Sequence, residues 1–139
     1  MTRTLYADAH VTVTIDDTEG LVRYARTREP YGALETFREQ NDRLLEAMSS
    51  LPTGTLQLLI DTRQAPPRND DAFEAELLRV LGAVVPRFRT YASLVKTAVG
   101  RLQVTRVAKA RGGDPVVFAE ERDALAYLQK HRASGASSR

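Results

Sequence analysis

Residues 56–63, LQLLIDTR, decide the fold of this chain. Four of the first five side chains are apolar, and the sequence then turns abruptly polar at Asp61, Thr62 and Arg63. The pattern predicts a buried strand that ends where the polar residues begin. A proline-rich polar segment, QAPPRNDD at 64–71, follows and leads into a helical pattern. Because open α/β sheets place ligand and partner sites beyond the carboxyl ends of their strands, we expect the candidate site here.

On the N-terminal side of this strand, the chain changes from strand to helix patterns. Residues 5–27 alternate apolar and polar side chains around the turn sequence DDTEG at 16–20, which predicts an antiparallel hairpin or meander. Between Gly32 and Pro52, apolar residues recur at helical spacing and predict an amphipathic helix.

On the C-terminal side, strand and helix patterns continue to alternate. A helix is predicted from Asp71 to Pro86, then a strand at 91–99, a helix at 101–111, a short strand at 115–118 and a last helix at 119–130. Alternation of this kind favours parallel strands joined by helices. The predicted fold is therefore α/β, with a mixed sheet that has an N-terminal antiparallel hairpin, a parallel portion and about four helices.

Length and composition favour one domain. The chain has 139 residues, of which 42% are hydrophobic, so it can bury one core of ordinary size. Residues 1–130 are predicted to form this single domain, and the small polar residues of 131–139, HRASGASSR, a disordered tail. The apolar runs fall far short of the roughly 20 residues needed to span a bilayer. We therefore expect a cytoplasmic protein without membrane insertion.

The basic residues are unevenly distributed. Residues 77–113 contain eight Lys or Arg and no acidic residue, which leaves twelve basic against eighteen acidic residues in the remainder. This asymmetry favours attraction to an acidic partner or a phosphate. It is also compatible with charges on ordinary solvated faces. Nucleic acid is not expected as a partner, because the segment lacks interleaved aromatic residues on which bases could stack.

Signatures of enzymes, metals and cofactors are absent from the sequence. There is no cysteine, the histidines are His10 and His131, and the motifs GxGxxG, GxxxxGK[ST] and GxSxG do not occur. We therefore expect no catalytic residue, no metal site, no cofactor and no enzymatic activity.

Several segments together resemble a known family. They are the N-terminal hairpin, LLIDTR at 58–63, NDDAFE at 69–74, YASLVKTAVG at 91–100 and VVFAEERDALAYL at 116–128. This arrangement is similar to that of STAS domains, in the SpoIIAA-like, STAS/SEC14-like branch grouped with bacterial anti-sigma-factor antagonists. The resemblance covers residues 4–130. It implies a STAS-like fold and a non-enzymatic regulatory module that binds a signalling partner.

The resemblance also implies a site. In anti-sigma-factor antagonists a serine or threonine directly after an aspartate is phosphorylated by a partner kinase, and Asp61 and Thr62 match this pattern. Arg63 stands where the family has a second hydroxyl or a glycine. A phosphate on Thr62 would lie near Arg63 and Arg68, which could pair with it. The residues by themselves also allow a plainer interpretation, with Asp61 capping a turn and Thr62 serving as a β-branched strand residue.

Two functions therefore stay open. The first is a protein-interaction module in which the strand end, with Asp61, Thr62, Arg63 and Arg68, binds a signalling partner or a second copy of the chain. The second is a small-molecule or lipid-binding domain, suggested by the SEC14 association and by apolar helices that could part over a cavity. Arg101, at the start of a predicted helix, is a candidate anion-binding residue or a solvated one.

Overall fold

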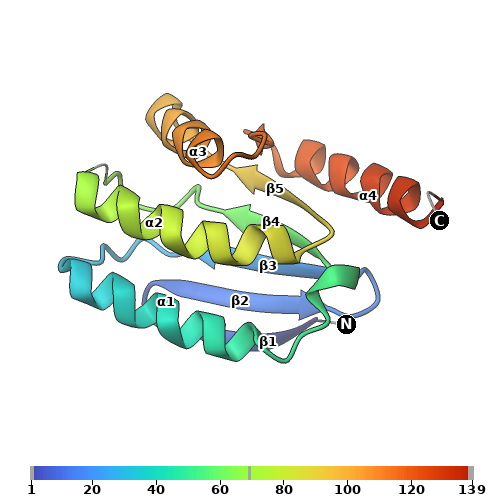
Figure 1. Cartoon of the computed structure of the whole chain (residues 1–139), viewed down its shortest axis with the longest axis horizontal. Coiled ribbons are helices and arrows are strands. Elements are labelled where there is room, and N and C mark those ends of the chain that lie inside the picture. The colour runs from blue at the N-terminus through green and yellow to red at the C-terminus, as the bar shows by residue number, and fades with distance from the viewer. Residues whose placement is uncertain (1, 69, 138–139) are drawn as a thin grey trace.

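The computed structural model describes residues 2–68 and 70–137, with side chains as far as residue 132. This part of the chain forms one six-stranded sheet and four α-helices, with two short 3₁₀ turns at Thr53–Thr55 and Val85–Arg87 (Figure 1). The strands are β1 (Thr2–Ala7), β2 (Val11–Asp16), β3 (Leu21–Arg26), β4 (Gln57–Asp61), β5 (Thr90–Leu94) and β6 (Val117–Phe118); the helices are α1 (Leu34–Met48), α2 (Asp71–Val84), α3 (Ala98–Ala110) and α4 (Glu121–Ser137).

The sheet is mixed, and its strands lie in chain order from β1 to β6. β1, β2 and β3 pair antiparallel, whereas the pairs β3–β4, β4–β5 and β5–β6 are parallel. Short turns suffice for the antiparallel pairs, while each parallel pair requires a crossover, and the helices provide it. The predicted fold class is confirmed: an N-terminal antiparallel hairpin, a parallel portion and four helices.

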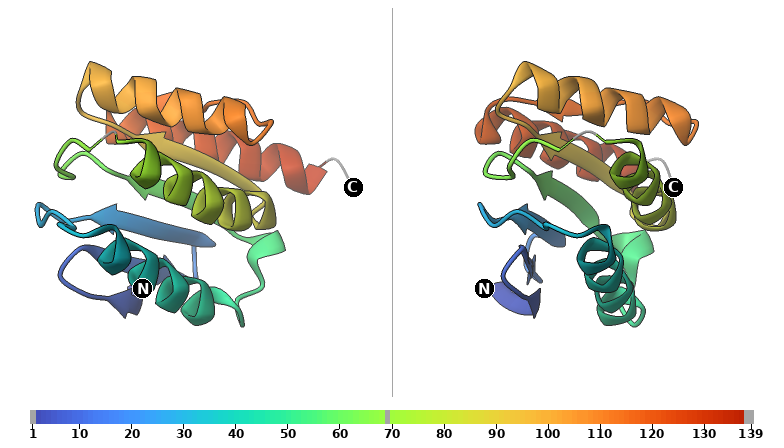
Figure 2. Two further views of the ribbon diagram at one scale, coloured as in Figure 1. Left: turned by 60° about the vertical axis from the view of Figure 1, so that its left-hand side comes forward. Right: turned by 90° about the vertical axis from the view of Figure 1, so that its left-hand side faces the viewer.

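The two faces of the sheet are covered by different helices. Side chains alternate between the faces along a strand, so Leu58 and Ile60 pack with α1 and α2, whereas Leu59 packs with Ala124 and Leu128 of α4. α4 contacts β4, β5 and β6. Figure 2 shows that α4 covers only this half of its face, and α3 follows α2 at the β6 side of the molecule. The strand that LQLLIDTR predicted is thus central and covered on both faces.

The helix after β5 begins earlier than the sequence predicted. We expected a strand through residue 99 and a helix from 101, but β5 ends at Leu94 and α3 starts at Ala98. Thr97 decides the boundary, because its hydroxyl oxygen accepts a hydrogen bond at 3.0 Å from the Gly100 N–H and caps the helix. Lys96, which we had placed within the strand, is consequently exposed in the connection.

The C-terminal helix is longer than predicted. α4 continues to Ser137, so residues 131–137 are helical rather than a disordered tail, and residues 138 and 139 lie outside the described part of the chain. Small polar residues do not end a helix unless a proline or a cap interrupts the backbone hydrogen bonding, and 131–137 contain no proline. Among the described residues, no helix has both the length and the apolar character needed to cross a bilayer.

Candidate functional site

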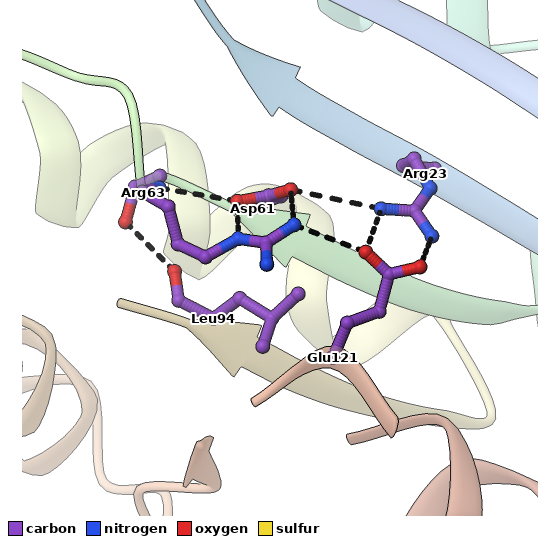
Figure 3. Close-up of polar contacts among 6 residues, drawn as sticks. Arg23, Asp61, Arg63, Leu94 and Glu121 are labelled. Carbon is purple, nitrogen blue, oxygen red and sulfur yellow. Dashed lines mark hydrogen bonds and ion pairs between the residues drawn. The ribbon is translucent and has the colours of Figure 1, made fainter. Parts of the chain in front are cut away.

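The end of β4 carries a four-residue ion-pair network. Asp61, the last residue of β4, accepts hydrogen bonds from Arg63 at Nε (2.9 Å) and Nη2 (2.8 Å). Glu121, the first residue of α4, accepts from Arg63 Nη2 at 3.0 Å and from Arg23 Nη2 at 2.8 Å. Arg23 Nη1 lies 3.6 Å from Asp61, which closes the network (Figure 3). Two strands, a loop and the N-terminus of α4 are therefore held together by alternating charges.

The network holds its carboxylates in the charged form. Burial by itself raises the pKa of Asp61, but the hydrogen bonds and the charge of Arg63, together with the charge of Arg23, outweigh it and leave the pKa below its ordinary value. The hydrogen bond from Arg23 is the largest influence on Glu121, and its pKa is lowered too. Asp61 Oδ1 also accepts from the Arg63 backbone N–H at 3.1 Å, so it caps the turn after β4.

Thr62 lies on the opposite face of the sheet from this network. Its hydroxyl donates to the Leu94 carbonyl at 3.1 Å, and its side chain lines a cavity. The predicted switch residues are therefore separated: Asp61 and Arg63 bind each other on the α4 face, while Thr62 faces the helices α1 and α2. Adjacent residues of a strand point to opposite faces, so this separation follows directly from the backbone.

The cavity lies between the sheet and helices α1, α2 and α3. Its volume is about 100 Å³, and most of its wall is apolar. The sheet contributes Val13, Val22, Leu58 and Ile60, and the helices contribute Phe37, Leu44, Leu77 and Val80. A few polar groups join them, among them Asn41, Thr62 and Ser93. An apolar hollow with a few converging polar groups is typical of a small-molecule site.

A second hollow, of about 270 Å³, lies beside the cavity, and we call it the mouth. The two share Arg26, Pro66, Arg68 and Phe73 in their walls. The mouth lies where β3 ends and where the proline-rich segment after β4 passes, which is the strand end that LQLLIDTR indicated. The hollow thus lies beside the strand end where the sequence placed the candidate site, and the role of that site stays a prediction.

Two arginines flank this mouth. Arg26 donates to the carbonyls of His10 (2.8 Å) and Glu29 (2.9 Å), and its guanidinium lies 4.3 Å from the Tyr31 ring centre. Arg68 donates to Asp70 (2.8 Å), and its guanidinium lies 5.0 Å from the ring centre of a phenylalanine in the wall. The Asp70 carboxylate offsets the charge of Arg68, whereas the carbonyls bonded to Arg26 do not neutralise its guanidinium, so Arg26 keeps its positive charge at the mouth.

A buried polar chain runs from the mouth into the α1–α2 interface. Tyr31 donates to Gln40, Gln40 donates to Asn41 at 3.3 Å, and Asn41 donates to Glu76 at 2.9 Å. Glu76 has only 4% of its side chain exposed and is paired with Arg79 at 2.7 Å. The apolar spacing between Gly32 and Pro52 predicted the helix but not this series of hydrogen bonds. Asn41 is a polar residue among apolar helix positions, and this feature of the sequence could have indicated the buried polar contacts.

The remaining predicted residue, Arg101, belongs neither to the network nor to the residues that line the mouth. It is exposed in the first turn of α3, and it makes no ion pair with any residue that the structure describes. Within the same part of the chain, no cluster of three or more His, Asp or Glu could hold a metal ion.

Comparisons with known proteins bear on the fold. No protein-family model matches the chain, and a search of curated proteins finds no significant match. Among solved structures, the chain is similar to an uncharacterized protein of the DUF3478 family from Shewanella loihica PV-4, which has a SpoIIAA-like fold. The TM-score is 0.60 at 15% sequence identity, over 88% of this chain and 98% of that one. The chain therefore has a SpoIIAA-like α/β fold, as the resemblance to STAS domains predicted.

Proposed function

We propose that this protein is a non-enzymatic binding domain for a small anionic amphiphile. The apolar part of the ligand enters the cavity between the sheet and the helices, and its anionic group lies at the mouth against Arg26 and Arg68. The observation that carries the proposal is that the apolar cavity and the neighbouring mouth share two arginines, Arg26 and Arg68, in their walls. Arginine suits this role because its planar guanidinium binds carboxylates and phosphates bidentately.

The size of the hollow limits the ligand. A methylene group occupies about 27 Å³, near the roughly 30 Å³ that a water takes in the liquid. At this size the cavity of about 100 Å³ holds about four carbons, and the rest of a longer chain would lie in the mouth of about 270 Å³. A chain of medium length therefore fits, whereas a whole phospholipid does not.

The first experiment asks whether the cavity binds a matched pair of probes. Octanoate and octanol have the same number of carbons and differ in charge, and each is titrated while backbone amide signals are followed by NMR. We expect both to shift signals of the cavity wall, with octanoate binding about tenfold more tightly because of charge-assisted hydrogen bonds. Native mass spectrometry of freshly purified protein would identify a retained ligand.

Matched variants locate the site. Ala65 lines the cavity in the segment after β4, so Ala65→Phe should abolish binding, whereas Ala83→Phe, on the exposed side of α2, should leave it unchanged. Arg68→Gln should remove the preference for octanoate, and Arg122→Gln, exposed on α4, should not. Undiminished binding by a stably folded Ala65→Phe variant would refute the proposal.

The second candidate function is the protein-interaction module, and the half-covered sheet favours it. On the side of the sheet that α4 covers, no helix in the described part of the chain lies over β1, β2 and β3 (Figure 2). Thr12, Thr14 and Arg23 point to this open face. The ion-pair network borders this face, and Arg63 keeps 34% of its side chain exposed. A signalling partner or a second copy of the chain would bind here.

Thr14→Arg tests this candidate. The variant places a bulky charge in the centre of the open face, while Thr18→Arg adds the same group in an exposed turn. If the face binds a partner or a second copy, crosslinking and light scattering should lose the complex in Thr14→Arg alone, and changes at Asp61 and Arg63 should weaken it. A protein that is monomeric and forms no complex sensitive to Thr14→Arg would exclude this function.

A further inference from the structure

The wall of the candidate cavity contains polar groups of two kinds. Asn41 donates to Glu76 at 2.9 Å and accepts from Gln40 at 3.3 Å, so it is bound within the α1–α2 interface. The hydroxyl of Thr62 donates to the Leu94 carbonyl at 3.1 Å. Both side chains are therefore held by the protein itself, and neither needs a ligand as a partner.

Ser93 of β5 is of the other kind. Its backbone N–H donates to the Val116 carbonyl at 2.8 Å, but no described residue binds its hydroxyl. The residue is only 3% exposed and lines the cavity. Among the described residues, every fully enclosed polar side-chain atom has a hydrogen-bond partner, so the Ser93 oxygen is not enclosed by protein and opens into the cavity. A buried hydroxyl without a partner lowers stability, and such a group indicates a binding function.

The strand register places Ser93 further inside than Arg26 at the mouth. Ser93 pairs with Ile60 of β4, and Ile60 pairs with Tyr24 of β3, so these three residues form one row across the parallel strands (Figure 1). All three line the cavity. Arg26 lies two residues beyond Tyr24, which is roughly 7 Å along the strand direction. A ligand held by Arg26 at the mouth therefore extends inward toward the row of Ser93.

The surroundings of Ser93 limit the group that it can bind. A serine hydroxyl both donates and accepts, so it can pair with a hydroxyl or a carbonyl of a ligand. The nearby wall is apolar, with Leu58 and Ile60 on the strands and Leu77 and Val80 on α2. A second charged group there would lose its hydration without gaining an opposite charge, and a methyl group would leave the serine hydroxyl unpaired.

We propose that Ser93 is a specificity-determining residue, which selects amphiphiles with an uncharged hydrogen-bonding group, a hydroxyl or a carbonyl, near the end of the apolar chain. The anionic group stays at the mouth beside Arg26, and the far end of the chain binds Ser93. This inference rests on the proposed function, because it concerns the same cavity. It adds the class of ligand: a medium-chain acid with a second, uncharged polar group, rather than a plain fatty acid.

Three eight-carbon probes test the inference with the full chain. Octanoate has no hydroxyl, 8-hydroxyoctanoate carries one at the end of the chain, and 3-hydroxyoctanoate carries one near the carboxylate, where it would remain in the mouth. The Kd of each probe is measured by following backbone amide signals by NMR. We expect the wild type to bind 8-hydroxyoctanoate at least as tightly as octanoate, because Ser93 replaces the water that the ligand hydroxyl loses.

Matched variants isolate the hydroxyl of Ser93. Ser93→Ala should weaken the binding of 8-hydroxyoctanoate about tenfold relative to octanoate and 3-hydroxyoctanoate, because the terminal hydroxyl is then buried without a partner. Ser93→Thr keeps a hydroxyl and should keep the preference for 8-hydroxyoctanoate over octanoate. The control Thr105→Ala removes a hydroxyl from α3 outside the cavity wall, so it should leave all three affinities unchanged. Ser93→Ala should also leave Tm unchanged or raise it, since no described residue loses a partner.

The outcomes separate this inference from the proposed function. If octanoate binds but the ratio of the two affinities does not change in Ser93→Ala, the inference is overturned while the proposed function stands. Weaker binding of 8-hydroxyoctanoate than of octanoate by the wild type would overturn the inference in the same way. A clear fall in the Tm of Ser93→Ala would show a structural role for the hydroxyl and would overturn it too. If none of the three probes binds, both the inference and the proposed function are overturned.

Discussion

Replacing Asp61 with asparagine tests whether the network at the end of β4 stabilises the fold. Asparagine keeps the shape of the side chain but removes its charge. It places an amide donor against Arg63 Nη2, which in the wild type donates to Asp61 Oδ2 at 2.8 Å. One charge-assisted hydrogen bond is lost, and Arg23 loses the carboxylate that lies 3.6 Å away.

The expected loss of stability follows from burial. Only 13% of the Asp61 side chain is exposed, so water does not fully replace the lost contacts. Hydrogen bonds to charged groups contribute about 1.5–3 kcal/mol each, and we expect Asp61→Asn to lower the free energy of unfolding by about 2 kcal/mol. For a domain of this size, the corresponding fall in Tm is about 7 °C.

A matched control exists on the surface. Asp17 also binds an arginine at two nitrogens, Arg3 Nε (2.9 Å) and Nη2 (3.3 Å), but 58% of its side chain is exposed. Exposed pairs contribute little because water and salt screen them. Asp17→Asn should therefore leave urea unfolding almost unchanged. If Asp61→Asn destabilised the protein no more than Asp17→Asn does, the network would have no structural role, and our reasoning about it would be refuted.

The pH dependence adds a second readout. The pKa of Asp61 is lowered in the folded protein, so its contribution to stability is present above the unfolded pKa and is lost as the pH falls through the folded value. The difference between the wild type and Asp61→Asn should be constant from neutral pH to about pH 5 and should shrink below about pH 4. A difference that grew on acidification would contradict this assignment.

Three further substitutions test other parts of the fold by urea unfolding. Leu128→Ala should cost about 3 kcal/mol, because a 2% exposed side chain leaves a cavity between α4 and the sheet; a loss below 1 kcal/mol would contradict this packing. Thr97→Ala should cost about 1 kcal/mol through loss of the α3 cap, and Thr97→Ser should restore most of it. Asn41→Leu should cost about 2 kcal/mol, because buried Glu76 loses a donor at 2.9 Å; a neutral effect would show that the polar chain is dispensable.

The order of elements could be predicted because each is encoded locally. The alternation of residues 5–27, the helical stripe before Pro52 and the apolar run of LQLLIDTR indicate strands and helices by period alone. The ends of helices and strands were predicted less accurately where a helix-capping residue lies within an apolar run. Thr97 lies in such a run, and only its hydrogen bond to Gly100 shows that the chain is already helical there.

The residues that surround the candidate site could be predicted only in part. Asp61 and Arg63 were identified by their place at a strand end, yet their partners Arg23 and Glu121 are 38 and 60 residues from Asp61 in sequence, and no local pattern connects them. No local pattern indicates the cavity either, because its wall combines residues of four strands and three helices. Spaces between packed elements depend on side-chain volumes that meet only after folding.

The sequence by itself therefore determined the α/β class and a central strand within 56–63, because hydrophobic period and turn residues act over short distances, while the site at the strand end stays a prediction. Only the tertiary structure decided what surrounds that strand end. Packing placed Asp61 and Arg63 against each other on one face and Thr62 beside a cavity on the other. It also brought Arg26 and Arg68 together at the mouth, because parallel packing of β3 and β4 aligns their carboxyl ends.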